Sequence, residues 1–114
     1  MIKGIGTDIV DVRRIARLID ESGEKFLARI FNDEERTTKT GEPAMCHYAK
    51  RFAAKEAVAK ALGTGIGETN FKDIKILKTP SGQPYALVKG LDKKIHISIS
   101  DEYPYATAFA VIED

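Results

Sequence analysis

The hydrophobic and polar positions change their spacing along the chain, and this change predicts helices in the first half and strands in the second. A single strand precedes the helices, because residues 2–10 alternate imperfectly between apolar and polar or glycine positions. Val12, Ile15 and Ile19 then share one face of an amphipathic helix that ends near residues 22–23. Asp11 is placed to cap this helix, because its carboxylate can accept bonds from free backbone N–H groups.

The next segments continue the helical spacing. Residues 24–31 predict a second short helix, and Asn32 is placed to cap the acidic turn that follows it. The polar residues 37–43 predict a mobile loop. Residues 44–62 predict the longest helix, which is rich in Ala and Lys and should end at Gly63.

After this helix the apolar residues recur at every second position. The pattern predicts strands over residues 71–77, 85–88, 95–99 and 105–112, with turn chemistry at residues 79–82. Helices grouped before a run of strands favour an α+β fold with an antiparallel sheet over a doubly wound fold.

Length and composition limit the class of protein. A chain of 114 residues that is 43% hydrophobic is long enough for a single domain with a real core. Its formal net charge of +1 argues against a dedicated nucleic-acid binder. The single cysteine, Cys46, fits a reducing compartment, and neither a signal peptide nor a membrane-spanning run is recognisable. We expect a small, soluble, cytoplasmic protein.

Two glycine-rich segments raise the possibility of dinucleotide binding, but neither fits that pattern. Residues 4–9 place Ile9 where the third glycine is required, and residues 63–67 follow a helix instead of a strand. The alternative is that these glycines serve turns and the end of a helix. Three glycines among residues 63–67 are more than one helix end needs.

Four residues are candidates for phosphate and metal chemistry. Asp8 lies among apolar neighbours, where it is either an edge residue facing solvent or a ligand for a hard cation. Glu56 and Lys60 share one helix face and are either a solvated ion pair or part of a Mg²⁺ and phosphate site, with Lys55 beside them. Spacing alone does not bring Asp8 to this helix.

The remaining charged candidates have equally open interpretations. The arginines of the first helix form either a solvated face or a docking stripe for an acidic protein. His96 alternates to the opposite sheet face from Ile95 and Ile97, which favours a structural role over a catalytic one. Cys46 is an ordinary helix residue in this interpretation.

Two segments together are specific enough to indicate a family. They are GIGTDIVDVRRI at residues 4–15 and RFAAKEAVAKALGTG at residues 51–65. This pairing of a G-x-D motif with a W/F-x-x-K-E-x-x-x-K motif closely resembles the bacterial holo-acyl-carrier-protein synthases, which are small phosphopantetheinyl transferases. The similarity continues through residues 71–74, 82–84 and 96–100, and so covers essentially the whole chain as one phosphopantetheinyl transferase-like domain, residues 1–114.

The resemblance implies roles for individual residues. Asp8 and Glu56 would hold Mg²⁺, with the pyrophosphate of coenzyme A completing its shell, and Lys60 would lie against the phosphates. Asp8, Glu56 and Lys60 would thus be the catalytic residues. The residues implied in coenzyme A binding are Arg51, Lys60, Gly63 and Gly65. The proton acceptor stays open between Glu56 and a metal-bound water.

The activity implied by the resemblance is a transfer between two partners. Phosphopantetheine would pass from coenzyme A to a serine of apo-acyl carrier protein, with release of adenosine bisphosphate, giving the holo carrier for fatty acid biosynthesis. Arg13, Arg14 and Arg17 would dock the acidic carrier. Members of this short type are homotrimers with active sites between subunits, and neither nucleic acid nor membrane is an expected partner.

One position departs from many relatives, and two other functions compete. Asp101 stands where many relatives have His, so no coenzyme A contact is carried over to it. The rival enzyme is a Mg²⁺-dependent nucleotide pyrophosphatase that uses the same carboxylates. The rival from another class is a non-catalytic module that binds an acidic protein through the first helix.

Overall fold

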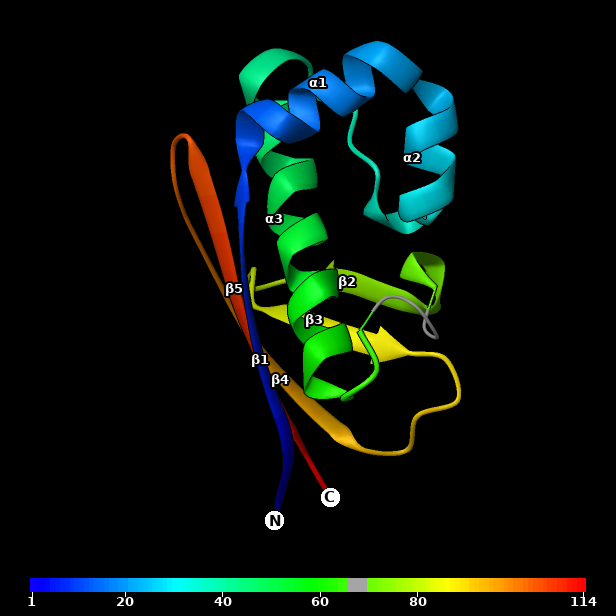
Figure 1. The fold of residues 1–114 in the computed structure, drawn as a ribbon, viewed down its shortest axis with the longest axis vertical. Coiled ribbons are helices and arrows are strands. Elements are labelled where there is room, and N and C mark those ends of the chain that lie inside the picture. The colour runs from blue at the N-terminus through cyan, green and yellow to red at the C-terminus, as the bar shows by residue number, and fades with distance from the viewer. Residues whose placement is uncertain (66–69) are drawn as a thin grey trace.

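A long central helix lies across one face of a three-stranded sheet, and two short helices cover one end (Figure 1). The computed structural model describes residues 1–65 and 70–114. The elements, in chain order, are β1 (Ile2–Asp11), α1 (Val12–Ser22), α2 (Glu24–Ile30), η1 (Asp33–Glu35), α3 (Gly41–Ala61), η2 (Phe71–Asp73), β2 (Ile74–Lys78), β3 (Pro84–Val88), β4 (Lys94–Glu102) and β5 (Tyr105–Glu113). The α+β class with antiparallel sheets is confirmed. None of the described helices is long and apolar enough to cross a membrane.

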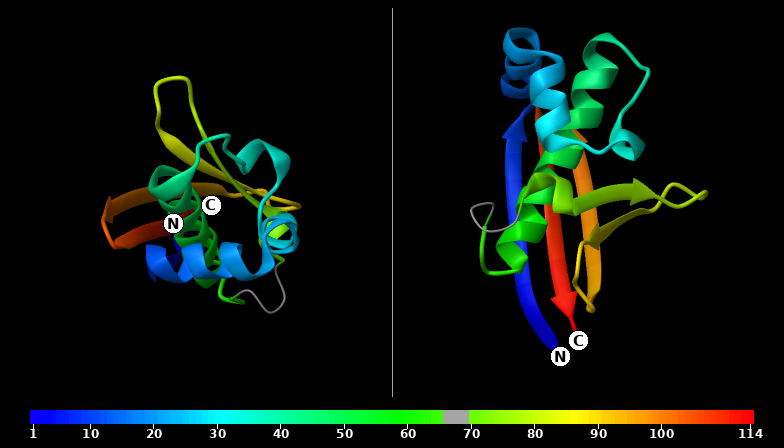
Figure 2. Two further views of the ribbon diagram at one scale, coloured as in Figure 1. Left: turned by 90° about the horizontal axis from the view of Figure 1, so that it is seen from above. Right: turned by 90° about the vertical axis from the view of Figure 1, so that its right-hand side faces the viewer.

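The order of the strands determines which residues lie at the two edges of the main sheet. β5 runs antiparallel between β1 and β4, so β1 and β4 form opposite edges. β2 and β3 form a separate antiparallel hairpin that projects from the body of the molecule (Figure 2). Because α3 packs against the sheet between these edges, side chains from α3 can meet β1 on one side and β4 on the other.

The packing of β1 against α3 depends on small residues. Ala53, Ala57 and Ala61 of α3 are almost fully buried. Gly4 lies within β1, where a Cβ atom would come within 1.8 Å of the Ala61 carbonyl oxygen. The prediction that the first glycines serve a turn is therefore wrong, since Gly4 and its neighbour Gly6 instead allow strand and helix backbones to approach closely.

The predicted helix ends are largely confirmed. Asp11 Oδ1 accepts a bond of 2.9 Å from the Arg13 backbone N–H, and α1 ends at Gly23, whose φ is 51°. The predicted loop 37–43 is wrong in its last three residues, because α3 begins at Gly41. Pro43 fits there, since the N–H groups of a first helical turn need no partner within the helix.

A buried ion pair connects α3 to the two 3₁₀ turns. Lys55 and Glu35 are fully buried, and their Nζ and Oε1 atoms are 2.7 Å apart. Lys55 also donates to the carbonyl groups of Phe71 and Ile74, while Glu35 Oε2 accepts from the Ile76 backbone N–H at 3.0 Å. The predicted strand 71–77 consequently begins only at Ile74, after the turn that Lys55 holds. Lys55 has a structural role here and does not face Asp8.

Candidate active site

Asp8 and Lys60 meet where β1 passes α3. Lys60 Nζ donates to the Thr7 carbonyl oxygen at 2.9 Å and to Asp8 Oδ1 at 3.2 Å. The Asp8 side chain is 17% exposed and that of Lys60 is 53% exposed. Asp8 is thus on an edge strand, as one interpretation of the sequence predicted, but it faces α3 and is largely shielded from solvent. The fold brings together two predicted residues that spacing could not place side by side.

Glu56 completes a carboxylate pair with Asp8. Its pKa is raised above the usual value, first by burial and then by the negative charge of Asp8, while Lys60 and Arg14 oppose the shift. The two carboxylates are therefore close enough to repel one another. Lys60, one helical turn after Glu56, supplies the compensating positive charge beside them.

The carboxylate pair has the chemistry of a Mg²⁺ site that is completed by a substrate. Mg²⁺ is commonly held by one or two carboxylates together with phosphate oxygens and water. Within residues 1–65 and 70–114, no cluster of three or more His, Cys, Asp or Glu side chains could hold a metal by itself. Asp8 and Glu56 fit such an ion as two oxygen donors whose repulsion it would relieve, provided that the substrate supplies further ligands.

The glycines after α3 follow Lys60 directly. The Gly63 N–H donates to the Lys60 carbonyl oxygen at 3.0 Å, and Gly65 N–H donates to that of Ala59 at 3.1 Å. Both glycines have positive φ values, 84° and 65°, which favour residues without a Cβ atom. Gly63 therefore ends the helix as predicted. Positions 66 and 67 of the same predicted loop lie outside the described residues.

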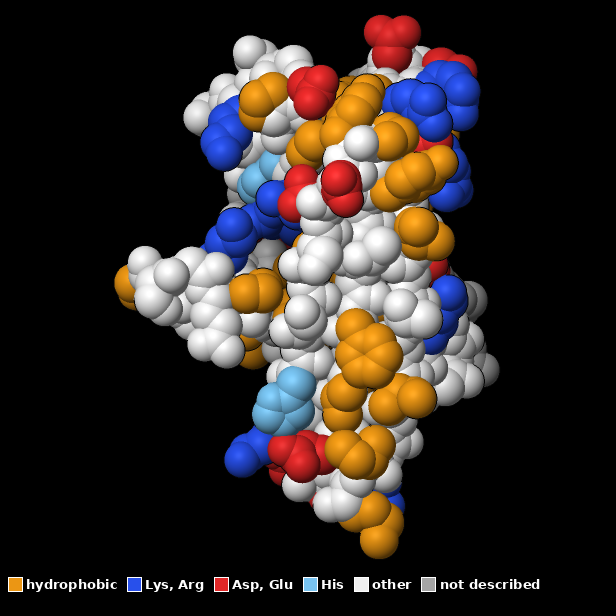
Figure 3. Space-filling model, turned by 90° about the vertical axis from the view of Figure 1, so that its left-hand side faces the viewer, with side chains coloured by type: hydrophobic (Ala, Val, Ile, Leu, Met, Phe, Trp, Pro, Cys, Tyr) orange, Lys and Arg blue, Asp and Glu red, His pale blue; other side chains and the backbone are white. Residues whose placement is uncertain are grey.

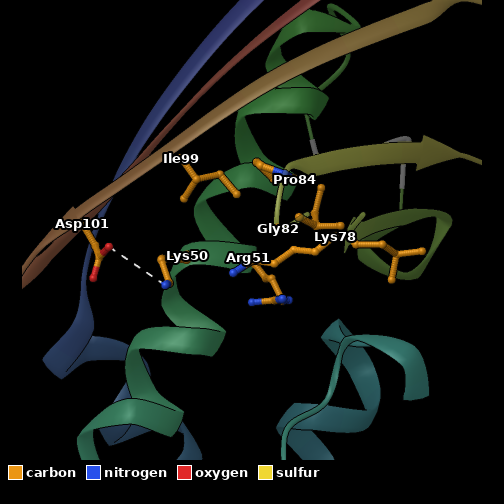
Figure 4. A pocket seen from close by; sticks show the side chains of 9 residues that line it. Lys50, Arg51, Lys78, Gly82, Pro84, Ile99 and Asp101 are labelled. Carbon is orange, nitrogen blue, oxygen red and sulfur yellow. Dashed lines mark ion pairs between the residues drawn. The ribbon is translucent and has the colours of Figure 1, made fainter. Parts of the chain in front are cut away.

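Arg51 lies apart from this centre and lines a cavity of about 150 Å³ between α3, β4 and the hairpin (Figure 4). Lys50, Lys78 and Asp101 line the same cavity, and Lys50 Nζ lies 4.0 Å from Asp101 Oδ1. Sequence reasoning missed Lys50 and Lys78. The sequence offered one signal for Lys78: it directly follows the predicted strand 71–77 and precedes the predicted turn, a position where a polar side chain can reach a neighbouring cavity. The cavity adjoins β4, whereas Asp8 lies on β1 at the other edge of the sheet.

The three arginines of α1 are all exposed but have different neighbours. Arg13 makes two bonds to the Asp11 carboxylate, of 3.0 and 2.6 Å, and this pairing lowers the pKa of Asp11 to about 2. The Arg14 guanidinium lies 5.8 Å from the centre of the Phe52 ring, and its positive charge opposes the rise in the pKa of Glu56. Arg17 follows one helical turn after Arg13. The stripe thus continues from the candidate active site along α1.

Two other candidates lie away from these groups. His96 is exposed on the sheet face opposite Ile95 and Ile97, as predicted, and its Nε2 atom lies 2.7 Å from Glu113 Oε1. Cys46 is partly buried in α3, and burial raises the pKa of its thiol, which disfavours the reactive thiolate.

Comparison with known proteins identifies the family. Residues 4–110 match the profile of the 4′-phosphopantetheinyl transferase superfamily. The chain belongs to this superfamily. The holo-[acyl-carrier-protein] synthase of Brucella ovis is 41% identical in an alignment that covers 99% of this chain and 96% of the relative. The family predicted from the paired motifs is therefore confirmed.

Solved phosphopantetheinyl transferase structures share the fold over the same length. A holo-(acyl-carrier-protein) synthase from Bacillus anthracis, in complex with CoA (3′,5′-ADP), is 38% identical with a TM-score of 0.90, covering 99% of this chain and 97% of that one. The Helicobacter pylori enzyme in complex with coenzyme A is 33% identical with a TM-score of 0.86, covering 96% and 99%.

Proposed function

We infer that this chain transfers the phosphopantetheine group from coenzyme A to a serine of apo-acyl carrier protein and releases adenosine bisphosphate. The observation that carries this conclusion is the full-length similarity to holo-acyl-carrier-protein synthases, at 41% identity to the Brucella ovis protein. Relatives solved with coenzyme A support the same substrate. The activity is therefore favoured over a nucleotide pyrophosphatase and over a non-catalytic binding module.

We propose that Asp8 and Glu56 hold a Mg²⁺ ion together with the pyrophosphate of coenzyme A. When bound, this ion supplies positive charge to the phosphate oxygens as the pyrophosphate bond breaks. The mutual repulsion of the two carboxylates supports this assignment, because it gives the pair a reason to accept a cation. Lys60 already donates to Asp8 and would turn its ammonium group to the phosphates.

Coenzyme A would contact this chain at two places, at the glycines that follow the end of α3 and at Arg51 in the middle of the helix. Gly63 and Gly65 would lie near the phosphates, because they closely follow Lys60 and their lack of side chains leaves room beside its ammonium group. Arg51 would bind another part of coenzyme A from the cavity next to β4. The positive charge of Arg51 suits an anionic ligand.

We also propose a homotrimer with active sites between subunits. Hydrophobic side chains gather on the sheet face that α3 does not cover (Figure 3), and Ile5, Ile9 and Phe109 are each about half exposed or more there. A second copy of the chain would bury this surface. Asp8 lies on the edge strand β1, whereas the cavity that Arg51 lines adjoins the opposite edge, β4. This separation supports a shared site, in which each copy contributes a different edge.

The carrier protein would dock on α1 through Arg13, Arg14 and Arg17. An acidic partner suits this stripe, and the stripe ends beside Glu56, where the acceptor serine has to arrive. The holo carrier produced would serve fatty acid biosynthesis in the cytoplasm, a compartment with which the free thiol of Cys46 is consistent.

Intact-mass analysis of apo-acyl carrier protein tests the activity directly. Incubation with this protein, coenzyme A and Mg²⁺ should add one phosphopantetheine to the carrier, and a chelator should abolish the gain. Release of adenosine bisphosphate without any carrier would instead support the pyrophosphatase. A stable complex with the carrier that is indifferent to Mg²⁺ and unmodified after incubation would support the binding module.

A further inference from the structure

The cavity beside β4 contains three cationic side chains and one carboxylate. Lys50 and Arg51 enter it from α3, Lys78 enters from the end of β2, and Asp101 faces them from β4 (Figure 4). The cavity therefore carries a formal charge of about +2, from three cations and one anion. This excess positive charge suits a ligand with two negative charges.

The cations are only partly paired within the described residues, where Arg51 Nη1 donates to the His47 carbonyl oxygen at a long 3.3 Å. The Arg51 Nε atom is buried and makes no hydrogen bond to the described residues. The pKa of Lys78 is lowered by burial first, and then by repulsion from Lys50, Arg51 and Lys39, while Asp101 alone among the named charges opposes this shift. An unpaired buried donor and crowded cations both favour an anion in the cavity.

The Asp101 carboxylate only partly satisfies these cations. Lys50 Nζ and Asp101 Oδ1 are 4.0 Å apart, and the two side chains are 28% and 41% exposed. An ion pair this long and this exposed contributes little to stability, so it separates readily when a stronger anion arrives. Asp101 is nevertheless close enough to repel that anion.

We propose that Asp101 is a built-in counter-ion that competes with the phosphate monoester of coenzyme A for the cations of this cavity, and thereby lowers the affinity for coenzyme A. This inference rests on the proposed function. The pyrophosphate of coenzyme A is assigned to Asp8, Glu56 and Lys60, which leaves the monoester on the ribose as the remaining phosphate. A phosphate monoester carries about −1.5 to −2 charges near neutral pH, which matches the excess charge of the cavity.

Calorimetric titration in the presence of Mg²⁺ tests this role with two ligands, coenzyme A and dephospho-coenzyme A, which lacks the monoester. We expect Asp101→Asn to tighten coenzyme A binding by about three- to tenfold and to change dephospho-coenzyme A binding by less than about twofold. Glu102→Gln is the matched control, because it removes the same charge at the next residue, which does not line this cavity. This control should leave both affinities unchanged.

A second variant guards against an indirect effect of the substitution. Adding Lys50→Gln to Asp101→Asn should return the affinity for coenzyme A toward that of the wild-type protein, because one of the released cations is lost. Equal or weaker coenzyme A binding by Asp101→Asn overturns the proposal, and so does equal tightening for both ligands. If the wild-type protein neither binds coenzyme A nor modifies a carrier, the proposed function itself is wrong, and the role proposed for Asp101 is then wrong as well.

Discussion

Gly6 and Ala57 lie so close together that a Cβ atom on the glycine would come within 2.0 Å of the Ala57 carbonyl oxygen. This contact joins the middle of β1 to α3, one turn before Lys60 and next to Glu56. Asp8 follows Gly6 by two residues and so points to the same side of the strand. The absence of a side chain at Gly6 therefore brings the Asp8 carboxylate to the candidate site.

The first prediction follows from this contact. Gly6→Ala should destabilise the protein by at least about 2 kcal/mol, because the new methyl group meets backbone that cannot move aside without shifting the helix. Urea denaturation measures the loss. Thr7→Ala is the control, since Thr7 is exposed on the other face and loses only one hydrogen bond, to the Ala108 carbonyl. Similar losses for both variants would contradict the role given to Gly6.

The fold could be predicted well from the sequence where local signals agree. Asp11 as a cap and Gly63 as a helix end have direct physical consequences for the neighbouring backbone, and both are confirmed. The start of α3 at Gly41 could not be predicted, because glycine and proline near a helix start resemble a loop. The turn at Phe71 could not be predicted either, because it depends on a long-range contact. Buried Lys55 donates to the Phe71 carbonyl oxygen and pairs with Glu35, and neither contact leaves a local signal in the sequence.

The candidate site could be predicted only through the paired motifs. No spacing rule brings Asp8 to Glu56, because 47 residues of intervening chain have to fold before the two meet. The motif resemblance supplied this juxtaposition, and the bond between Asp8 and Lys60 agrees with it. The cavity around Asp101 could not be predicted, because its residues come from three elements whose packing leaves no periodic pattern.

Charge reversal on α1 tests carrier docking. Arg14→Glu should raise KM for the carrier by about tenfold or more, because an acidic partner would meet a negative charge beside the active site, and should change KM for coenzyme A far less. Steady-state kinetics with each substrate varied in turn measure both values. Lys25→Glu is the control, since it makes the same charge change on the neighbouring helix α2. Equal effects of Arg14→Glu on both substrates would count against docking.

Assembly into a trimer should depend on Phe109, which lies on the exposed face of the sheet. Phe109→Asp should convert a trimer into monomers and lower transfer, because a charge would be buried at the centre of the proposed interface. Light scattering coupled to size exclusion gives the mass. Leu87→Asp is the control, since Leu87 is similarly exposed but lies on the β2–β3 hairpin. A monomeric wild-type protein with full activity would refute the shared site.

The partly buried His47 side chain should make the folded protein less stable in mild acid. Burial lowers its pKa from 6.5 to about 4, and its Nε2 atom lies 2.7 Å from the Glu35 carbonyl oxygen. Between these two pH values the unfolded imidazole binds a proton that the folded one does not, so stability falls as the pH decreases from about 6.5 to about 4.

The contribution of His47 is measured by comparison with a variant. Urea denaturation across this pH range should show that wild-type protein loses about 1–3 kcal/mol more than His47→Gln, after allowance for the solvent that reaches the ring. Other groups that titrate in the range act equally in both proteins, so the difference isolates His47. Parallel pH profiles would show that the folded and unfolded imidazoles titrate alike.

The substitution Glu56→Gln should affect stability and activity in opposite directions. Burial and the charge of Asp8 both penalise the ionised form of Glu56, so a neutral amide of the same shape should leave the melting temperature unchanged or raise it. Transfer should fall by about a hundredfold or more, because a donor for the proposed Mg²⁺ is lost. Lys60→Met should lower transfer as well, but by leaving Asp8 and Glu56 without a compensating cation it should also lower the melting temperature. A Glu56→Gln variant that unfolds more easily would mean that the carboxylate supports the fold, and one that keeps full transfer would remove it from the active site.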